Sequence, residues 1–453
     1  MTKKFTIVSL GCAKNTIDTE QMLYVLFEAG YEYVEDPDDA DVGIVNTCAF
    51  IEDAKSESIQ EIIELSEAKT TGAMHALVVT GCMAERYKTE IFSEMPEVDA
   101  LVGTGSYLRI AEVCDSLLEA SERGKLERIA IFDDINAPVR ECGRVQSTPP
   151  ATAFIKIAEG CDNCCGYCVI PSVRGCYRSR KMEHIIEEAK GLAESGVREL
   201  ILVAQDISRY GIDIYNRYAL AELLTELAKI EKLDWIRLHY LYPDEITDEL
   251  IYVIAKEEKI LKYIDMPVQH SSDRLLESMN RRYSRSELES LIKKLRREIK
   301  GVVIRTSIIV GLPGETEEDF EGLCAFVKKM KFERLGVFPY SREEGTPAGE
   351  MENQVPDEIK NQRAEHIEQL QSRVMDSFNR KRIGAKVDVL VEGYDTFAGY
   401  FYSRSYAESP EIDGLVFFKP KSVRPKAGDM VTVKILEDLD GDIIAEYDEA
   451  TIR

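Results

Sequence analysis

The stretch EGCDNCCGYC, residues 159–168, is the most informative part of the sequence. It directly follows TAFIKIA (152–158), whose apolar and β-branched residues predict a β-strand. Cys161, Cys165 and Cys168 stand at the spacing C-x3-C-x2-C. With 11 cysteines among 453 residues, this spacing arises by chance in under ~1% of cases. The loop after this strand is therefore expected to bind a metal centre, because closely spaced thiolates are soft metal ligands.

Zinc and iron-sulfur binding are the alternatives for this loop. A zinc site would pair Cys161 with Cys164 and Cys165 with Cys168, but adjacent Cys164 and Cys165 leave no loop between the pairs, which disfavours a tetrahedral site. In a three-cysteine site, Cys164 is an inert neighbour or a competing ligand when another cysteine is lost. The odd number of cysteines, 11, disfavours a framework of paired disulfides. The remaining unpatterned cysteines are expected to be small buried hydrophobes without a role: Cys114, Cys142, Cys176 and Cys324.

Downstream of the loop, strand-like runs alternate with helical segments. Runs are expected at 199–204, 234–240, 262–267, 302–310 and 334–338, and helices include 220–230, 286–300 and 317–331. With the strand before the loop, this makes six β/α units with parallel strands. The cysteine loop would lie at the carboxyl ends of the strands, where β/α barrels place their active sites.

The front third repeats a unit that ends in a cysteine. FTIVSLGC (5–12), DVGIVNTC (41–48) and ALVVTGC (76–82) are strand-like, with helix-like segments at 19–29 and 54–66 between them. A parallel α/β sheet would gather these strand ends along one edge, bringing Cys12, Cys48 and Cys82 together. Each could simply be a buried hydrophobe, but recurrence in three units favours a three-thiolate site. It suits either an iron-sulfur cluster with one open iron or a zinc ion with one exchangeable ligand.

The C-terminal part predicts a helical connector at 357–383 and then short strands broken by Gly, Asp and Pro, as in a small β-barrel. The fold class is thus α/β, with an N-terminal parallel α/β domain (1–145), a central partial (β/α)6 barrel (146–378) and a C-terminal all-β barrel (379–453). The last domain carries 11 basic and 14 acidic residues, which favours protein contact or packing over RNA binding.

Composition and charge further narrow the class of protein and the kinds of partner that are expected. The 44% hydrophobic and 31% charged residues are typical of a globular protein. No stretch reaches the ~20 uncharged apolar residues of a membrane helix, and the N-terminus lacks a secretion signal, so we expect a cytoplasmic protein without a membrane partner. The net charge of −25 disfavours nucleic acid as a partner. Residues 1–145 hold 13 basic and 28 acidic groups, interpreted as solubility charge or as steering of a basic partner.

The C-x3-C-x2-C loop, with Tyr167 just before its last cysteine, resembles the signature of the radical S-adenosylmethionine (SAM) superfamily. That resemblance implies a four-iron four-sulfur (4Fe-4S) cluster on Cys161, Cys165 and Cys168, with SAM chelating the fourth iron. Electron transfer into the sulfonium would then yield a 5'-deoxyadenosyl radical able to remove hydrogen from an unactivated carbon. It also implies the partial six-unit β/α barrel.

Three further segments narrow the resemblance to the methylthiotransferases: GCAKNTIDTE (11–20), NTCAFIEDAKSES (46–58) and GCMAERY (81–87). The resemblance covers nearly the whole chain. It implies a second, auxiliary 4Fe-4S cluster on Cys12, Cys48 and Cys82, whose open iron carries the sulfur to be transferred. It also implies two uses of SAM, one to methylate that sulfur and one to form the radical, and a terminal barrel of the TRAM type.

The substrate class is a further implication of this resemblance. Four segments are closer to the type that modifies an aspartate β-carbon in small-subunit ribosomal protein S-twelve: IRLHYLYP (236–243), YIDMPVQHSSDRLLESMNR (263–281), GVFPYSREEGTPA (336–348) and RSYAESPEIDG (404–414). The alternatives are the related enzymes that modify an adenosine of transfer RNA, and a non-enzymatic metal-binding or ribosome-binding protein with structural cysteines. An electron donor and a sulfur donor would be further partners.

The resemblance also suggests contacts with SAM. Tyr167 would pack against adenine, and Gln205 and Asp206 follow the strand at 199–204. Gly314 lies in the turn IVGLPGET (309–316). Such a turn needs its glycines for chain reversal in any case, so a purely structural role is an equal alternative. Beyond the cluster ligands, the sequence identifies no catalytic residue.

Overall fold

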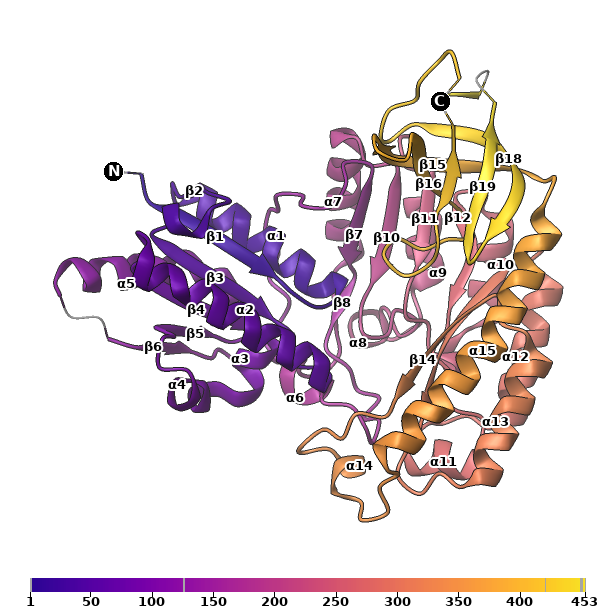
Figure 1. The fold of residues 1–453 in the computed structure, drawn as a ribbon, viewed down its shortest axis with the longest axis horizontal. Coiled ribbons are helices and arrows are strands. Elements are labelled where there is room, and N and C mark those ends of the chain that lie inside the picture. The colour runs from indigo at the N-terminus through magenta and orange to yellow at the C-terminus, as the bar shows by residue number, and fades with distance from the viewer. Residues whose placement is uncertain (1, 125–126, 420, 449–450, 453) are drawn as a thin grey trace. The chain divides into compact units, whose positions relative to one another are not determined.

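The computed structural model describes residues 2–124, 127–419, 421–448 and 451–452. The chain forms two compact units, coloured by residue number in Figure 1. The first comprises Met1–Ser147, Ala158–Arg180 and Glu343–Gly349, and the second comprises Thr148–Ile157, Lys181–Arg342 and Glu350–Arg453. The cysteine loop at 161–168 therefore folds with the N-terminal segment, although it follows the first strand of the central sheet in sequence.

The first unit is built on a six-stranded parallel sheet of order β2-β1-β3-β4-β5-β6. Its strands are β1 (Lys4–Ser9), β2 (Glu32–Tyr33), β3 (Val42–Thr47), β4 (Ala76–Gly81), β5 (Ala100–Val102) and β6 (Ile129–Ile131). Its longer helices are α1 (Ala13–Glu28), α2 (Glu52–Thr71) and α5 (Ile110–Glu122), with the shorter α3 (Cys82–Tyr87) and α4 (Ile91–Glu94). The three predicted strands that end in cysteines are confirmed as parallel neighbours.

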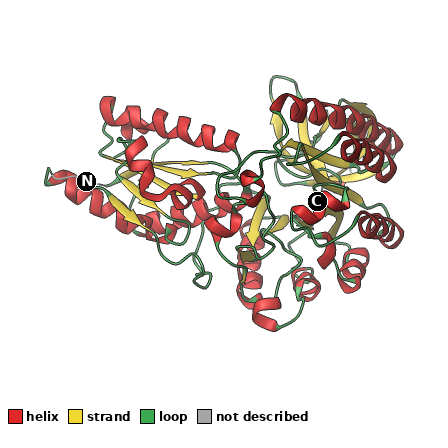
Figure 2. Ribbon diagram, turned by 90° about the horizontal axis from the view of Figure 1, so that it is seen from below, coloured by secondary structure: helices red, strands yellow, loops and turns green. Residues whose placement is uncertain are grey.

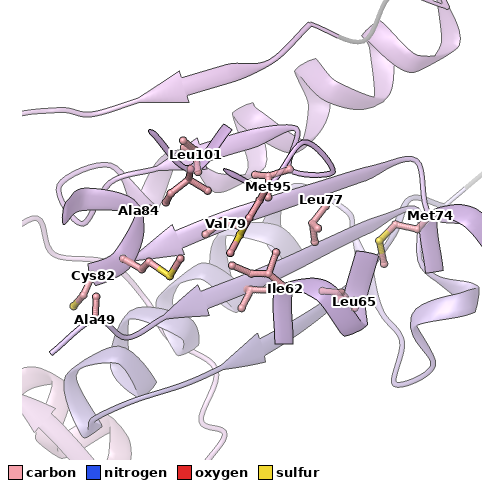
Figure 3. Close-up of a cluster of buried hydrophobic side chains, with 14 of the residues drawn as sticks. Ala49, Ile62, Leu65, Met74, Leu77, Val79, Cys82, Ala84, Met95 and Leu101 are labelled. Carbon is pink, nitrogen blue, oxygen red and sulfur yellow. The ribbon is translucent and has the colours of Figure 1, made fainter. Parts of the chain in front are cut away.

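Helices cover both faces of this sheet (Figure 2). Alternate strand residues point to opposite faces. Val79 thus packs with α2, α3 and α4, whereas Val78 packs with α1 and α5. Figure 3 shows the first of these clusters, with Cys82 and Ala49 at one end and Met74 at the other. The thiol of Cys82 therefore lies where the apolar core meets the carboxyl edge of the sheet.

Helix α1 begins earlier than its apolar periodicity predicts. The periodicity predicts a start at residue 19, but the helix begins at Ala13, directly after Cys12. Its first turns carry Asn15 and Asp18, polar residues that hydrophobic periodicity treats as solvent-facing. Both are buried in the structure. Cys12 therefore lies at the amino end of a helix.

A short hairpin holds the cysteine loop within the first unit. Strands β8 (Ala158–Glu159) and β9 (Arg178–Ser179) pair antiparallel and enclose helix α6 (Ile170–Arg174). The loop therefore begins and ends at one small ladder, which fixes both of its ends.

The second unit contains six parallel strands in the order β14-β13-β12-β11-β10-β7, an open sheet that confirms the predicted partial (β/α)6 barrel. They are β7 (Thr152–Lys156), β10 (Glu199–Val203), β11 (Trp235–Leu238), β12 (Ile260–Asp265), β13 (Val303–Val310) and β14 (Arg334–Pro339). The helices are α7 (Met182–Ser195), α8 (Ile212–Tyr215), α9 (Leu220–Leu227), α10 (Asp248–Lys256), α11 (Asp273–Ser278), α12 (Arg285–Glu298) and α13 (Glu317–Met330).

The same unit ends in helix α15 (Asp357–Arg382) and a closed five-stranded barrel of order β15-β16-β17-β19-β18, as predicted. The strands are β15 (Lys386–Asp395), β16 (Tyr400–Ser405), β17 (Val416–Phe418), β18 (Met430–Leu439) and β19 (Asp442–Tyr447). Its interior is apolar and includes stacked Phe401 and Phe418, with ring centroids 5.4 Å apart. None of the described helices is both long and apolar enough to cross a bilayer.

Buried ion pairs join this small barrel to the amino ends of two of the six parallel strands, β10 and β14. Arg404 of β16 donates to Glu199 at the start of β10 over 2.6 Å, and Arg237 donates to the same carboxylate over 2.7 Å. Glu408 accepts from Arg334 of β14 and from Arg382 of α15. The segment at 404–408 therefore closes the end of the sheet opposite to the carboxyl ends of its strands.

Candidate metal centres

Three cysteines follow the carboxyl ends of three neighbouring strands in the first unit. Cys12 comes three residues after β1, and Cys48 and Cys82 come directly after β3 and β4. Since β3 pairs with both β1 and β4, the cysteines reach the same edge of the sheet. This is the edge at which parallel α/β sheets bind ligands.

Glycine precedes two of the three cysteines, and the local backbone requires it. Gly11 has φ +90°, and a Cβ there would lie 2.8 Å from the Cβ of Cys48. Gly81 has φ +91°, and a Cβ there would lie 2.4 Å from Asn46 Oδ1 and 2.5 Å from the carbonyl oxygen of Thr47. A side chain at either position would push the strand ends apart, so the glycines bring the cysteine-bearing segments together.

Buried amides and a hydroxyl hold these strand ends in register. Asn15 of α1 donates from Nδ2 to the carbonyl oxygens of Leu10 (2.9 Å) and Thr47 (3.0 Å). Asn46 donates back to the Asn15 carbonyl oxygen over 3.0 Å. Ser58 of α2 accepts from the backbone N–H of Cys48 and donates to its carbonyl oxygen. The backbone around the thiols is therefore fixed by side chains that no sequence pattern singles out.

One buried cation lies beside the strand-end thiols. Arg174, at the end of α6, is 3% exposed and donates to Asn15 Oδ1 over 2.5 Å and to Asp18 Oδ2 over 2.6 Å. Its contact with Glu159 Oε2 is longer, at 3.4 Å. The same Asn15 oxygen lies 3.9 Å from Cys82 Sγ. Arg174 therefore connects the cysteine loop to the strand-end site.

The surroundings shift the pKa values of the three thiols in different directions. Burial by itself opposes a charge on Cys12, but Lys14 and Arg174 outweigh it and lower the pKa of that thiol below its ordinary value. Burial raises the pKa of Cys48 to about 11, and the charge of Cys82 adds to the shift. Burial also raises the pKa of Cys82, against the opposing charge of Arg174. Buried thiols without a metal therefore favour the neutral form at two of the three positions.

The second group of cysteines lies in the loop between β8 and β9. The backbone N–H of Cys161 donates to the Gly175 carbonyl oxygen over 3.0 Å, and that of Cys168 donates to the Cys165 carbonyl oxygen over 3.0 Å. Cys161, Cys165 and Cys168 are half-buried, whereas Cys164 is exposed and has φ +48°. Cys164 thus differs from the three signature cysteines in both exposure and backbone conformation.

A third segment of the chain completes this unit. Glu343 is buried and accepts from Arg86 of α3 over 2.6 Å, while Lys55 of α2 lies 3.3 Å from the same oxygen. The Ala348 N–H donates to the Gly166 carbonyl oxygen inside the cysteine loop over 2.8 Å. The segment at 343–349 therefore contacts both the helices of the strand-end site and the signature loop.

The donor sets fit iron-sulfur clusters. Each is made of three thiols, and the first has a buried guanidinium that can balance the negative charge of a thiolate-bound cluster. Among the described residues, no group of three or more Cys, His, Asp or Glu side chains is placed to hold a single metal ion. In a four-iron cluster, by contrast, each thiolate binds its own iron, so the sulfurs need not meet at one point. The ligand roles of the six cysteines remain a prediction.

The residues predicted to contact SAM fall in both units. Tyr167 is a half-buried residue of the signature loop. In the second unit, Gln205 and Asp206 follow β10, and Asp206 Oδ1 accepts from the Ser208 N–H over 3.0 Å, which orders that loop. Gly314 has φ +76°, and a Cβ there would lie 2.4 Å from Asn353 Nδ2. Asp206 and Gly314 therefore have structural roles, and SAM binding by all four residues stays a prediction.

Several residues of the strand-end site were missed by the sequence patterns. Arg174 is an isolated polar residue with no distinctive spacing. Asn15 and Ser58 lie within the segments at 11–20 and 46–58 that carry the family resemblance, but nothing in those segments marks them individually. A further signal was the repeated Gly-Cys pair at 11–12 and 81–82, because glycine before a cysteine at a strand end indicates a tight backbone approach.

Three family models match separate parts of the chain. Residues 4–103 match the uncharacterized protein family UPF0004, residues 155–327 match the radical SAM superfamily, and residues 383–447 match the TRAM domain. The predicted domain boundaries at 145/146 and 378/379 are not tested by these matches and stay a prediction. Among solved structures, TsrM, a radical SAM methyltransferase from Kitasatospora setae, matches with a TM-score of 0.55 at 16% identity, covering 77% of this chain and 75% of that one. This likeness shows the fold alone.

Curated relatives match nearly end to end. The ribosomal protein uS12 methylthiotransferase RimO of Caldanaerobacter subterraneus subsp. tengcongensis is 49% identical over 442 residues, which cover 97% of this chain and 99% of the relative. The RimO of Pelotomaculum thermopropionicum is 49% identical over 444 residues, covering 98% and 99%. Together with the two cysteine sets and the six-stranded sheet, these matches show that the chain belongs to the RimO family of radical SAM methylthiotransferases.

Proposed function

We propose that the protein transfers a methylthio group to the β-carbon of an aspartate in ribosomal protein uS12. The observation that carries this proposal is the full-length identity of 49% to relatives named for that activity. The gathering of Cys12, Cys48 and Cys82 at one sheet edge supports it, because sulfur transfer needs a site separate from the radical SAM loop. No feature of the described residues favours transfer RNA over uS12.

In this proposal each cysteine set holds one 4Fe-4S cluster. Cys161, Cys165 and Cys168 hold the radical SAM cluster, and Cys12, Cys48 and Cys82 hold the auxiliary cluster. When bound, the clusters and SAM supply one-electron reduction of the sulfonium and a carrier for the sulfur. The protein residues orient the ligands: Gly11 and Gly81 permit the close approach of the strand ends.

The remaining predictions belong to the same proposal. Tyr167, Gln205, Asp206 and Gly314 contact SAM, and the enzyme works in the cytoplasm with an electron donor and a sulfur donor. The excess of acidic residues suits encounter with a basic protein substrate, because complementary charge raises the rate of association.

The test is an anaerobic reaction of reconstituted protein with SAM, a reductant and a sulfur source. Purified uS12 and unmodified transfer RNA are offered in parallel, and products are analysed by mass spectrometry. We expect a methylthio group on one aspartate of uS12 and none on transfer RNA. Modification of transfer RNA alone would refute the substrate assignment.

Two cysteine variants make this test specific. Cys165→Ala removes a proposed ligand and should abolish modification. Cys164→Ala alters the adjacent, exposed cysteine and should retain it. Equal activity in both variants would contradict the assignment of the cluster ligands.

A further inference from the structure

Arg174 has a position that the cluster ligands alone do not explain. It ends α6, six residues after Cys168, and so belongs to the segment that carries the radical SAM cysteines. Its side chain, however, contacts residues of α1, Asn15 and Asp18. Arg174 is 3% exposed, and burying an arginine is costly unless acidic or polar groups pair with its charge.

The contacts of Arg174 lead to all three strand ends. The Asn15 amide that accepts from Arg174 also donates to the carbonyl oxygens of Leu10 and Thr47, which immediately precede the Gly11-Cys12 and Cys48 positions. Its Oδ1 lies 3.9 Å from Cys82 Sγ. One guanidinium is therefore linked through a single buried amide to the backbone or sulfur of every strand-end cysteine.

Arg174 also brings a buried positive charge to the site. Its guanidinium donates to the same Asn15 Oδ1 that lies 3.9 Å from Cys82 Sγ. Because the site is buried, such a charge is screened little by solvent. Asp18 and Glu159 hold the guanidinium in place from its other side.

We propose that Arg174 is a positioning residue for the auxiliary cluster. It binds Asn15 and Asp18 and thereby orients the three strand-end cysteines, and it supplies the buried positive charge that balances their thiolates. It also ties the radical SAM loop to this site, because it belongs to the helix that follows that loop. The inference rests on the proposed function, in which Cys12, Cys48 and Cys82 hold a cluster.

The test isolates the auxiliary cluster in the full-length chain. Cys161, Cys165 and Cys168 are replaced together by Ala, so that the iron retained after anaerobic reconstitution belongs to the strand-end site. In this chain Arg174→Gln and Arg174→Lys are compared for iron content, the electron paramagnetic resonance spectrum of the reduced cluster and its midpoint potential. Urea unfolding of each iron-free variant measures whether the fold is retained.

A second buried arginine that pairs with helix α1 provides a matched control. Arg144 forms a buried ion pair with Glu20 at 2.6 Å, and Glu20 lies on α1 five residues after Asn15. Arg144→Gln therefore removes a comparable buried charge beside the same helix and leaves the Arg174–Asn15 hydrogen bond in place. A second control repeats Arg174→Gln in a chain whose strand-end cysteines are replaced by Ala, where only the radical SAM cluster remains.

We expect Arg174→Gln to lose auxiliary iron and to shift the midpoint potential of the remainder to more negative values, since a buried positive charge favours the reduced cluster. Arg174→Lys, which keeps the charge, should restore the potential toward that of Arg174. Arg144→Gln should leave the iron content and the midpoint potential of the auxiliary cluster unchanged. In the chain without strand-end cysteines, Arg174→Gln should leave the same two quantities of the radical SAM cluster unchanged.

The two proposals fail in different ways. If the chain with Arg174 intact binds no iron at its strand-end cysteines, the proposed function loses its auxiliary site and this inference falls with it. If that chain binds iron, but Arg174→Gln matches Arg144→Gln in iron content, spectrum and potential, the positioning role is refuted while the proposed function stands.

Discussion

Replacing Gly81 by Ala is a direct test of how the strand-end site is built. Gly81 joins β4 to Cys82 with φ +91° and ψ −158°, a region that is almost restricted to glycine. Forcing alanine into it costs about 1–3 kcal/mol. The added Cβ would also lie 2.5 Å from the Thr47 carbonyl oxygen, and relieving such overpacking costs about 1–3 kcal/mol more. The expected loss of unfolding free energy is therefore about 2–6 kcal/mol.

The measurement is urea unfolding of the iron-free, full-length protein followed by circular dichroism. With an m-value of about 3 kcal/mol/M, the midpoint of the affected transition should fall by roughly 0.7–2 M. Iron content after reconstitution provides a second readout, since the clash moves Cys82 away from its partners.

Gly30 provides the matched control. It also has positive φ, at +83°, but nothing lies within 4 Å of the position that an added Cβ would take, so Gly30→Ala carries the backbone cost alone, about 1–2 kcal/mol. Gly81→Ala should therefore be the more damaging of the two and the only one to lose iron. Equal destabilisation and equal iron content would refute the reasoning that a close backbone approach builds this site.

Three other predictions concern the second unit. Burial opposes the charges of Glu199 and Glu408, but their arginine partners lower the pKa of each carboxyl to about 2. The stability that these carboxylates contribute is therefore present above pH 4.5 and is lost as the pH falls through about 2. Unfolding measured across an acid titration should show this loss, and a flat profile would contradict it. Arg404→Gln leaves Glu199 buried with one partner fewer and should cost about 3–5 kcal/mol in urea unfolding, whereas Lys421→Ala, at an exposed ion pair, should cost less than about 1 kcal/mol; similar values would count against the buried network. Gly314→Ala strains a turn at φ +76° and should weaken SAM binding in calorimetry, and unchanged affinity would remove this turn from the cofactor site.

Much of the fold was predictable because its elements carry strong local patterns. The parallel strands are apolar runs with β-branched residues, and they recur at regular spacing with helical segments between them. Strands β5 and β6 were missed because three residues each, ALV and IAI, are too short to form a pattern. The start of α1 was missed because its buried polar residues serve the cysteine site rather than the solvent-facing surface.

The candidate site was only partly predictable. The cysteines were found because their spacing and their recurrence at strand ends are rare. Arg174 was not found, because its role depends on contact with Asn15 and Asp18, which lie more than 150 residues away in sequence. Such long-range contacts leave no periodic signal. The association of the cysteine loop with the N-terminal sheet was likewise visible only in the folded chain.

The measurement that most directly tests the central claim is mass spectrometry of uS12 and of transfer-RNA nucleosides from cells with and without the gene. The account predicts that deletion removes the methylthio mass from one aspartate-containing peptide of uS12 and leaves transfer-RNA nucleosides unchanged. Re-expression of the chain should restore it, and re-expression of Cys165→Ala should not. A uS12 peptide that keeps its methylthio group after deletion, or a loss confined to a modified adenosine, would contradict the account.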